Sequence, residues 1–247
     1  MLRLRVLVYH DIVPRSEWPL DGPGRIRTAQ GQDDRLPERL YSWRDQFEAQ
    51  LDWLGTSGWS VVSPEAVALF YRGEGELPER SALITVDDLW KQGMSAAAAG
   101  LRRRGWRALA FMVRGWIFDD PQPERTGSPV CLSRGELEPL KDVFAFGNHG
   151  DRLHLRGASI EGIRGVDPFE LAADLARCEE WTTLPRVFAY PFGARDESAV
   201  RVLAREGYRL AFTIEPGENG ADTDPMALRR DVVPRDLSLE GFAELFR

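Results

Sequence analysis

Two adjacent carboxylates follow an apolar segment of the chain and are the first candidates for chemistry. Asp87 and Asp88 come directly after residues 82–86, a short run with β-branched residues that predicts a buried strand. Neighbouring carboxylates repel each other, and each is costly to dehydrate unless a positive charge lies beside it. A metal ion would supply that charge, although the acidic start of a helix over 91–104 would also account for the pair.

The chain has three histidines, and each is expected near the end of a predicted strand. His10 follows a strand predicted over 3–9, His149 follows one over 144–146, and His154 lies in the loop just beyond. The carboxyl ends of parallel strands meet at one face, which is the catalytic face of a (β/α) barrel. A lone histidine is usually structural, but three histidines gathered beside an acid pair favour a functional site.

His149 and His154 are five residues apart, a spacing that would separate their side chains by about 140° on an α-helix. Gly147 and Gly150 favour instead a loop that folds both imidazoles inward. With Asp88 they would offer two nitrogens and one oxygen, a set that leaves a coordination position for water, as in catalytic zinc sites. The sequence therefore predicts one divalent metal ion, with zinc expected and cobalt, nickel or iron as alternatives.

The other polar residues have separate expected tasks in a hydrolysis. A metal would lower the pKa of water from about 15.7 toward about 7 and make it a nucleophile. Asp87 is predicted to take the proton from that water as general base, and His10 to donate a proton to the leaving group. The turn Tyr190-Pro191-Phe192 adds a backbone N–H that could face the developing oxyanion, although such a turn is often only structural.

Composition limits the classes of protein to which the chain can belong. It has 247 residues, is 43% hydrophobic, and carries 32 basic against 39 acidic residues, for a formal net charge of −7. This predicts a single domain over 1–247 and argues against nucleic acid or an anionic membrane as the main partner. Cys131 and Cys178 are far apart and have no metal-ligand spacing, so we interpret both as packing residues.

The first ten residues alternate arginine with apolar residues, which is typical of a strand and lacks the apolar core of a signal peptide. No segment approaches the roughly 20 apolar residues that a membrane helix needs. The sequence as given therefore predicts a cytoplasmic protein, with export left open if a signal precedes it.

Predicted strands and helices alternate about seven times without a tandem repeat. This order predicts a parallel α/β architecture, either a (β/α) barrel or a partly broken one, with an open doubly wound sheet as the alternative. Residues 15–41 lack periodicity and are interpreted as a long loop that could act as a lid. Ser42 with Asp45 resembles a capping box at the start of the helix that follows.

In these motifs the chain resembles the polysaccharide deacetylases of carbohydrate esterase family 4, the NodB homology domain. The segment 85–89, Thr-Val-Asp-Asp-Leu, is similar to the family's Thr-Phe-Asp-Asp-Gly motif, and 147–154 is similar to its two-histidine motif. The wider histidine spacing, the Tyr-Pro-Phe-Gly at 190–193 and the Tyr-His at 9–10 are most similar to the branch of the poly-N-acetylglucosamine deacetylases.

The resemblance implies a distorted (β/α)7 barrel that removes N-acetyl groups from an amino sugar or its polymer. In the family the first Asp of the pair is the base and the second is a metal ligand, roles that map to Asp87 and Asp88. The two-histidine motif supplies the remaining ligands, His149 and His154, and His10 matches the general acid of the branch.

One departure from the family pattern keeps other functions open. Leu89 stands where the family has glycine, and its side chain could crowd the pocket or force a different backbone. With the widened histidine spacing, this leaves a catalytically impaired carbohydrate-binding protein as an alternative, besides a hydrolase of another small amide. Trp18, Trp90 and Trp116 are expected near the same face, where they would stack on sugar rings or only pack.

Overall fold

The computed structural model describes residues 2–125, 127–156 and 161–247. Its centre is an eight-stranded parallel sheet with the order β10-β1-β5-β6-β7-β8-β9, in which β4 pairs with β5 beside this path. The strands are β1 (Arg3–Tyr9), β4 (Ser60–Val61), β5 (Arg80–Asp87), β6 (Ala108–Met112), β7 (Phe144–Asn148), β8 (Val187–Ala189), β9 (Leu210–Phe212) and β10 (Asp231–Val232).

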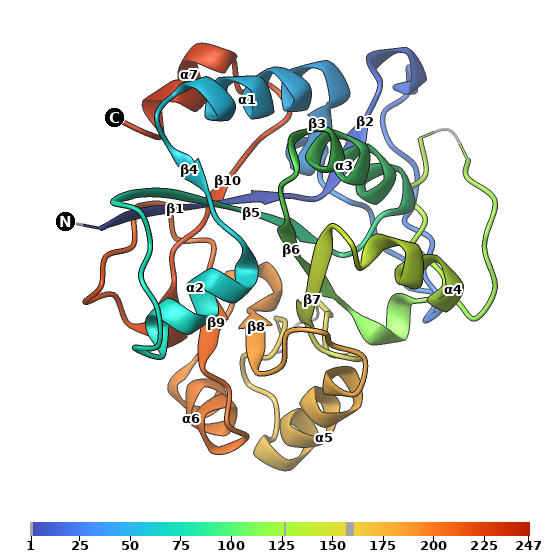
Figure 1. Cartoon of the computed structure of the whole chain (residues 1–247). Coiled ribbons are helices and arrows are strands. Elements are labelled where there is room, and N and C mark those ends of the chain that lie inside the picture. Colours follow the sequence, from blue (N-terminus) through green and yellow to red (C-terminus); the bar gives the residue numbers. More distant parts are fainter. Residues whose placement is uncertain (1, 126, 157–160) are drawn as a thin grey trace.

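The sheet curls on itself, and one short segment links its two edge strands. Leu228 forms a parallel bridge with Phe212 of β9, and Asp231 of β10 pairs with Leu7 of β1. The segment from 228 to 232, which contains β10, therefore spans the space between β1 and β9. This arrangement confirms the predicted distorted (β/α)7 barrel, and Figure 1 shows the strands gathered at the centre of the molecule.

Helices surround the curled sheet (Figure 1). They are α1 (Arg44–Thr56), α2 (Pro64–Tyr71), α3 (Lys91–Arg104), α4 (Arg134–Leu137), α5 (Pro168–Glu179), α6 (Glu197–Arg205) and α7 (Leu239–Glu244). The hydroxyl of Ser63 caps α2, and the carboxylate of Asp167 caps α5. The capping box predicted at Ser42 and Asp45 is wrong, because Ser42 lies in a strand and α1 begins after Trp43 without a side-chain cap.

Residues 15–41 are not a structureless loop. They contain two 3-10 turns, η1 (Arg15–Glu17) and η2 (Glu38–Leu40), and end at β3 (Tyr41–Trp43), which pairs with β2 (Asp11–Val13) in a separate small sheet. Backbone hydrogen bonds tie Arg27 to both Pro129 and Cys131, so this segment is attached to the chain that follows β6. A lid role for it stays a prediction.

The apolar core has an inner and an outer part. The inner part fills the barrel with side chains from one face of six strands. These residues are Leu4, Val6, Leu83, Leu109, Phe111, Ala145, Val187, Ala189, Leu210 and Phe212. The outer part packs the opposite face of the strands against α1, α3 and α7 and, in a separate cluster, packs β8 and β9 against α5 and α6. Because alternate residues of a strand point to opposite faces, this division fixes which side chains reach the barrel interior.

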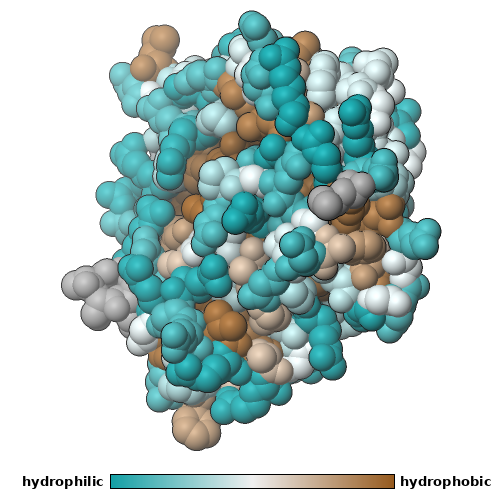
Figure 2. Space-filling view, turned by 90° about the vertical axis from the view of Figure 1, so that its left-hand side faces the viewer, coloured by the Kyte–Doolittle hydropathy of each residue, from teal (hydrophilic) through white to brown (hydrophobic). Residues whose placement is uncertain are grey.

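Within the described ranges, no helix has the length and apolar composition needed to cross a membrane. Figure 2 views the side on which β1 begins, and this face is largely hydrophilic with apolar residues scattered between polar ones.

Candidate metal centre

The alternation of side-chain direction along the strands directs three candidate side chains toward the mouth of the barrel. On β5, Leu83 lies in the inner core, so Asp87, four residues later, points to the same interior. The same alternation directs His149 inward after β7 and His10 inward after β1. The parallel register places Tyr9 beside Val86, so that His10 and Asp87 follow as neighbours on adjacent strands.

Asp88 and Leu89 turn the chain sharply after β5. Both residues have positive φ angles, 71° and 59°, which are uncommon for residues other than glycine. The turn is held by hydrogen bonds from Asp88 N to Phe111 O and from Leu132 N to Leu89 O. The Leu89 side chain is fully buried in the outer core and does not line the cleft, so it does not crowd the site.

Asp88, His149 and His154 form a compact cluster at the floor of this mouth. The Asp88 Oδ1 atom lies 3.7 Å from Nε2 of His149 and 3.6 Å from Nε2 of His154. One ligand atom from each residue lies within 4.8 Å of the others, and all three residues are buried. The five-residue spacing therefore does bring both imidazoles to one point, as the sequence predicts.

The orientation of His149 is fixed by a backbone carbonyl. Its Nδ1 lies 2.7 Å from Ala189 O at the end of β8, so the Nδ1–H donates to that carbonyl. This leaves the lone pair of Nε2 directed toward Asp88. Such a hydrogen bond on the far nitrogen is how proteins orient a histidine that ligates a metal.

The loop between the two histidines is held by a buried carboxylate of α5. Asp174 Oδ2 accepts from Asp151 N at 2.7 Å and its Oδ1 accepts from Arg152 N at 2.8 Å. Gly150 has a φ of 92°, and Asn148 Oδ1 accepts its N–H at 2.8 Å. Asp174 was not identifiable as a site residue from the sequence, because nothing in a helical pattern indicates which loop a helix side chain will contact.

The donor set fits a divalent metal ion. The Asp88 Oδ1 atom is buried without a hydrogen-bond partner among the described residues. Burial and the neighbouring Asp87 raise the pKa of Asp88 well above its ordinary value, so this carboxylate lacks a compensating charge. Burial lowers the pKa of both His149 and His154, which keeps their imidazoles neutral and able to donate lone pairs.

Asp87 is bound by an arginine that the sequence did not single out. Arg230 Nη1 and Nη2 donate to Asp87 Oδ1 and Oδ2 at 2.8 Å each, and Arg230 has no exposed surface. Although burial opposes ionisation, Arg230 and the nearby imidazoles lower the pKa of Asp87 to about 2. In the sequence, Arg230 is marked only by its place in a pair of arginines after Leu228.

His10 lies in the same pocket as a neutral imidazole. Burial lowers its pKa to about 4; the Asp87 carboxylate opposes this effect, and the positive charge of Arg230 adds to it. Its Nδ1 has no hydrogen-bond partner among the described residues. The electrostatics of the site therefore favour an uncharged His10 at neutral pH.

These residues open into a cleft of about 530 Å³. Tyr190 and Phe192 line this cleft, and the centroid of the Phe192 ring lies 4.3 Å from that of His154. Pro191 does not line it and faces Gly162 instead. Trp90 and Trp116 also line it, although both are almost fully buried. Trp18 does not; it packs against Tyr41 and Trp43 at a separate cavity.

Comparison with known proteins assigns this arrangement to a family. A family profile described as polysaccharide deacetylase matches residues 74–211, more than half of the chain. The chain belongs to the polysaccharide deacetylase family. The match includes the Asp pair and both histidines of the cluster, whereas His10 and Arg230 lie outside it.

Similar polysaccharide deacetylases share low sequence identity with this chain over most of its length. YxkH of Bacillus subtilis (strain 168) is 22% identical over 245 residues, covering 97% of this chain and 75% of the relative. The poly-beta-1,6-N-acetyl-D-glucosamine N-deacetylase of Escherichia coli (strain K12) is 24% identical over 268 residues, covering 94% of this chain. The chain spans only 40% of that longer protein.

Solved structures support the fold assignment. The Streptococcus pyogenes deacetylase PplD, described in complex with acetate, has a TM-score of 0.76 at 18% identity, covering 100% of this chain and 99% of that one. IcaB from Ammonifex degensii has a TM-score of 0.76 at 21% identity, covering 99% and 97%. The curled parallel sheet of this deacetylase is thus shared with both.

Proposed function

We propose that this polysaccharide deacetylase is a metal-dependent hydrolase that removes N-acetyl groups from an amino sugar or its polymer. The observation that carries the proposal is the Asp88, His149 and His154 cluster, whose ligand atoms converge at the floor of a cleft beside an ionised Asp87. The N-deacetylase relatives and the acetate in the PplD structure support the same reaction. The cleft has room for a sugar unit carrying an acetamido group.

Asp88, His149 and His154 would hold the ion, for which zinc is our first choice. A divalent ion bound there would act as a Lewis acid toward water and the acetyl carbonyl. Asp87 would accept a proton from the attacking water. Its two hydrogen bonds with Arg230 keep it ionised and fix its orientation, and each carboxylate oxygen retains a lone pair for the proton.

His10 would deliver the proton that the leaving nitrogen requires. Because its imidazole is neutral in the free site, it must first gain a proton, and its position beside Asp87 suits it to receive from that carboxylate the proton that water released. Phe192 and Tyr190 would shape the pocket for the acetyl group. The Tyr190 hydroxyl donates to Met226 O at 2.9 Å, so its contribution is the ring rather than the hydroxyl.

Two alternatives from the sequence have less support. The reasons for a catalytically impaired carbohydrate-binding protein were Leu89 and the wide histidine spacing, but Leu89 packs in the core and the histidines converge on Asp88. A hydrolase of another small amide would use the same residues, and no described residue of the cleft favours such an amide over a sugar.

Metal content and acetate release test the proposal together. The purified protein is analysed for bound zinc, cobalt, nickel and iron, and then assayed with N-acetylglucosamine oligomers and small acetylated sugars. We expect stoichiometric metal in the wild type, retained metal without acetate release in Asp87→Asn, and loss of metal in His149→Ala. Asp142→Asn removes an exposed carboxylate outside the cleft and should behave like the wild type. Reconstituted protein that binds no metal and releases no acetate from any substrate would exclude the proposal.

A further inference from the structure

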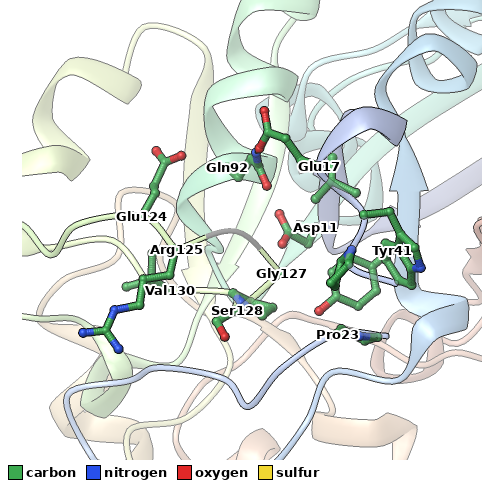
Figure 3. A pocket seen from close by; sticks show the side chains of 14 residues that line it. Asp11, Glu17, Pro23, Tyr41, Gln92, Glu124, Arg125, Gly127, Ser128 and Val130 are labelled. Carbon is green, nitrogen blue, oxygen red and sulfur yellow. The ribbon is translucent and has the colours of Figure 1, made fainter. Parts of the chain in front are cut away.

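A second cavity, of about 150 Å³, lies next to the catalytic cleft but is lined by different residues. Consecutive residues face the two spaces, since His10 lines the cleft and Asp11 lines the second cavity. Leu40 and Tyr41 divide in the same way. Figure 3 shows this cavity between the start of α3, the small β2–β3 sheet and the segment around Ser128.

Two buried polar oxygen atoms at this cavity lack hydrogen-bond partners among the described residues. Asp11 and Tyr41 are each only 2% exposed, and neither Asp11 Oδ1 nor the Tyr41 hydroxyl has a hydrogen-bond partner among the described residues. Both side chains project into the cavity in Figure 3. Because buried polar groups in native proteins are almost always hydrogen-bonded, two such groups facing one space indicate a missing polar occupant.

The charges around the cavity favour a cationic occupant. Asp11, Glu17 and Glu124 line it, and the guanidinium of Arg125 is directed away from Asp11 in Figure 3. Burial raises the pKa of Asp11 to about 7, and the N–H groups of Gly93 and Ile12 only partly offset this effect. A cation in contact with the carboxylate would remove most of the remaining cost of ionising it.

A bare metal ion does not fit this charge pattern. Among the described residues, the Asp88 cluster is the one group of acidic, histidine or cysteine side chains whose ligand atoms converge within 4.8 Å. Glu17 is instead hydrogen-bonded, because Gln92 Nε2 donates to its Oε2 at 2.5 Å. The separated acceptors suit a cation that carries its own hydrogen-bond donors and spans several ångströms.

We propose that this cavity binds a primary ammonium group carried by a small hydroxylated molecule, namely an amino sugar unit without its acetyl group. The ammonium would donate to Asp11, and the sugar hydroxyls would pair with Tyr41 and Ser128. The volume of about 150 Å³ allows one such unit. The choice of an amino sugar rests on the proposed function, because deacetylation in the adjoining cleft generates this chemical group.

Isothermal titration calorimetry on the whole metal-loaded protein tests the proposal. The probes are glucosamine, glucose as the same sugar without the amine, and ethanolamine as an amine without the sugar. We expect glucosamine to bind at least tenfold more tightly than either of the other two. A glucosamine disaccharide distinguishes the two sources of the ligand, since tighter binding than the monosaccharide would indicate a unit of a polymer.

Variants locate the binding. Asp11→Asn should weaken glucosamine binding at least tenfold, and Tyr41→Phe, which removes only a hydroxyl, should weaken it severalfold. Asp142→Asn is the matched control, because it removes an exposed carboxylate that lines neither cavity. Thermal unfolding of each variant shows whether it is folded, and Tyr41→Phe keeps the test valid if Asp11→Asn is not.

Three results would overturn the proposal: equal affinity for glucosamine and glucose, unchanged affinity in both Asp11→Asn and Tyr41→Phe, or no binding, which would mean that water alone fills the cavity. The readout is binding and needs no turnover. Failure of acetate release with intact glucosamine binding would therefore reject the proposed function alone, and the reverse pattern would reject this site alone.

Discussion

The carboxylate of Asp87 and the guanidinium of Arg230 face each other through two hydrogen bonds of 2.8 Å, with both side chains buried. The same guanidinium donates to Thr213 O at 2.8 Å and to Thr85 Oγ1 at 3.2 Å. Arg230 thereby joins β5 to the chain after β9 and sets the direction of Asp87 before any substrate binds. Positioning of this kind reduces the reorganisation needed in a reaction.

Replacing Arg230 with methionine should destabilise the protein strongly. The change leaves the Asp87 carboxylate buried without its charge partner, an effect that typically costs about 3 to 5 kcal/mol. Urea unfolding measures it, and the double variant Asp87→Asn/Arg230→Met should recover a large part of the loss. An Arg230→Met variant as stable as the wild type would show that the ion pair is not formed.

Asp174 should control metal affinity without touching the metal. Asp174→Ala removes the acceptor for the N–H groups of Asp151 and Arg152, so the loop that carries His154 loses its support. We expect a drop of about 10- to 100-fold in metal affinity, measured by competition with a chelator. Asp167→Ala is the control on the same helix, since it removes the exposed cap of α5 and should cost about 1 kcal/mol of stability with little change in metal affinity.

The parts of the site that the sequence predicts are those set by local pattern. A period of two along β5 and β7 determines that Asp87 and His149 point into the barrel. The carboxyl ends of parallel strands lie at the same end of the barrel, regardless of the conformation of the loops that follow them. The Asp88 cluster could therefore be predicted before any contact was known.

The parts that could not be predicted depend on contacts between distant segments. Arg230 lies 143 residues from Asp87 in the chain, and no local pattern distinguishes it from a surface arginine. Ser42 and Asp45 satisfied a helix-start pattern, but pairing of β3 with β2 drew Ser42 into a strand. From the sequence, the Leu89 side chain could have crowded the pocket. It points into the core instead because Leu89 adopts a left-handed backbone conformation, which sequence rules expect mainly of glycine.

Leu89→Gly should reduce stability and leave catalysis nearly unchanged. Glycine relieves a positive φ angle worth about 1 kcal/mol, but loss of a fully buried leucine costs about 2 to 5 kcal/mol, so the net effect is destabilising. Because the side chain points away from the cleft, kcat/KM for acetate release should stay within a few-fold of the wild type. A tenfold gain in turnover would mean that Leu89 does crowd the substrate.

Asp11 should make stability depend on pH in a defined direction. Its pKa is raised from an ordinary 3.8 to about 7 in the folded protein. The stabilisation that comes from its protonated form is therefore fully present below pH 4 and is lost as the pH rises through 7. The groups that face it include Glu124 and Tyr41, neither of which supplies a positive charge. Relative to the wild type, Asp11→Asn should gain up to about 4 kcal/mol in unfolding free energy between pH 4 and pH 8. Parallel curves of unfolding free energy against pH would contradict this assignment.

Removal of metal should lower the melting temperature, because the ion compensates the buried Asp88 carboxylate only in the folded state. An ion present at 1,000 times its dissociation constant stabilises by about 4.1 kcal/mol, which corresponds to roughly 10 °C for a chain of this size. Differential scanning calorimetry with and without a chelator measures the shift. His149→Ala should melt at a lower temperature from the start and respond little to the chelator, since one ligand is already absent. An equal response in both proteins would place the stabilising ion somewhere other than this cluster.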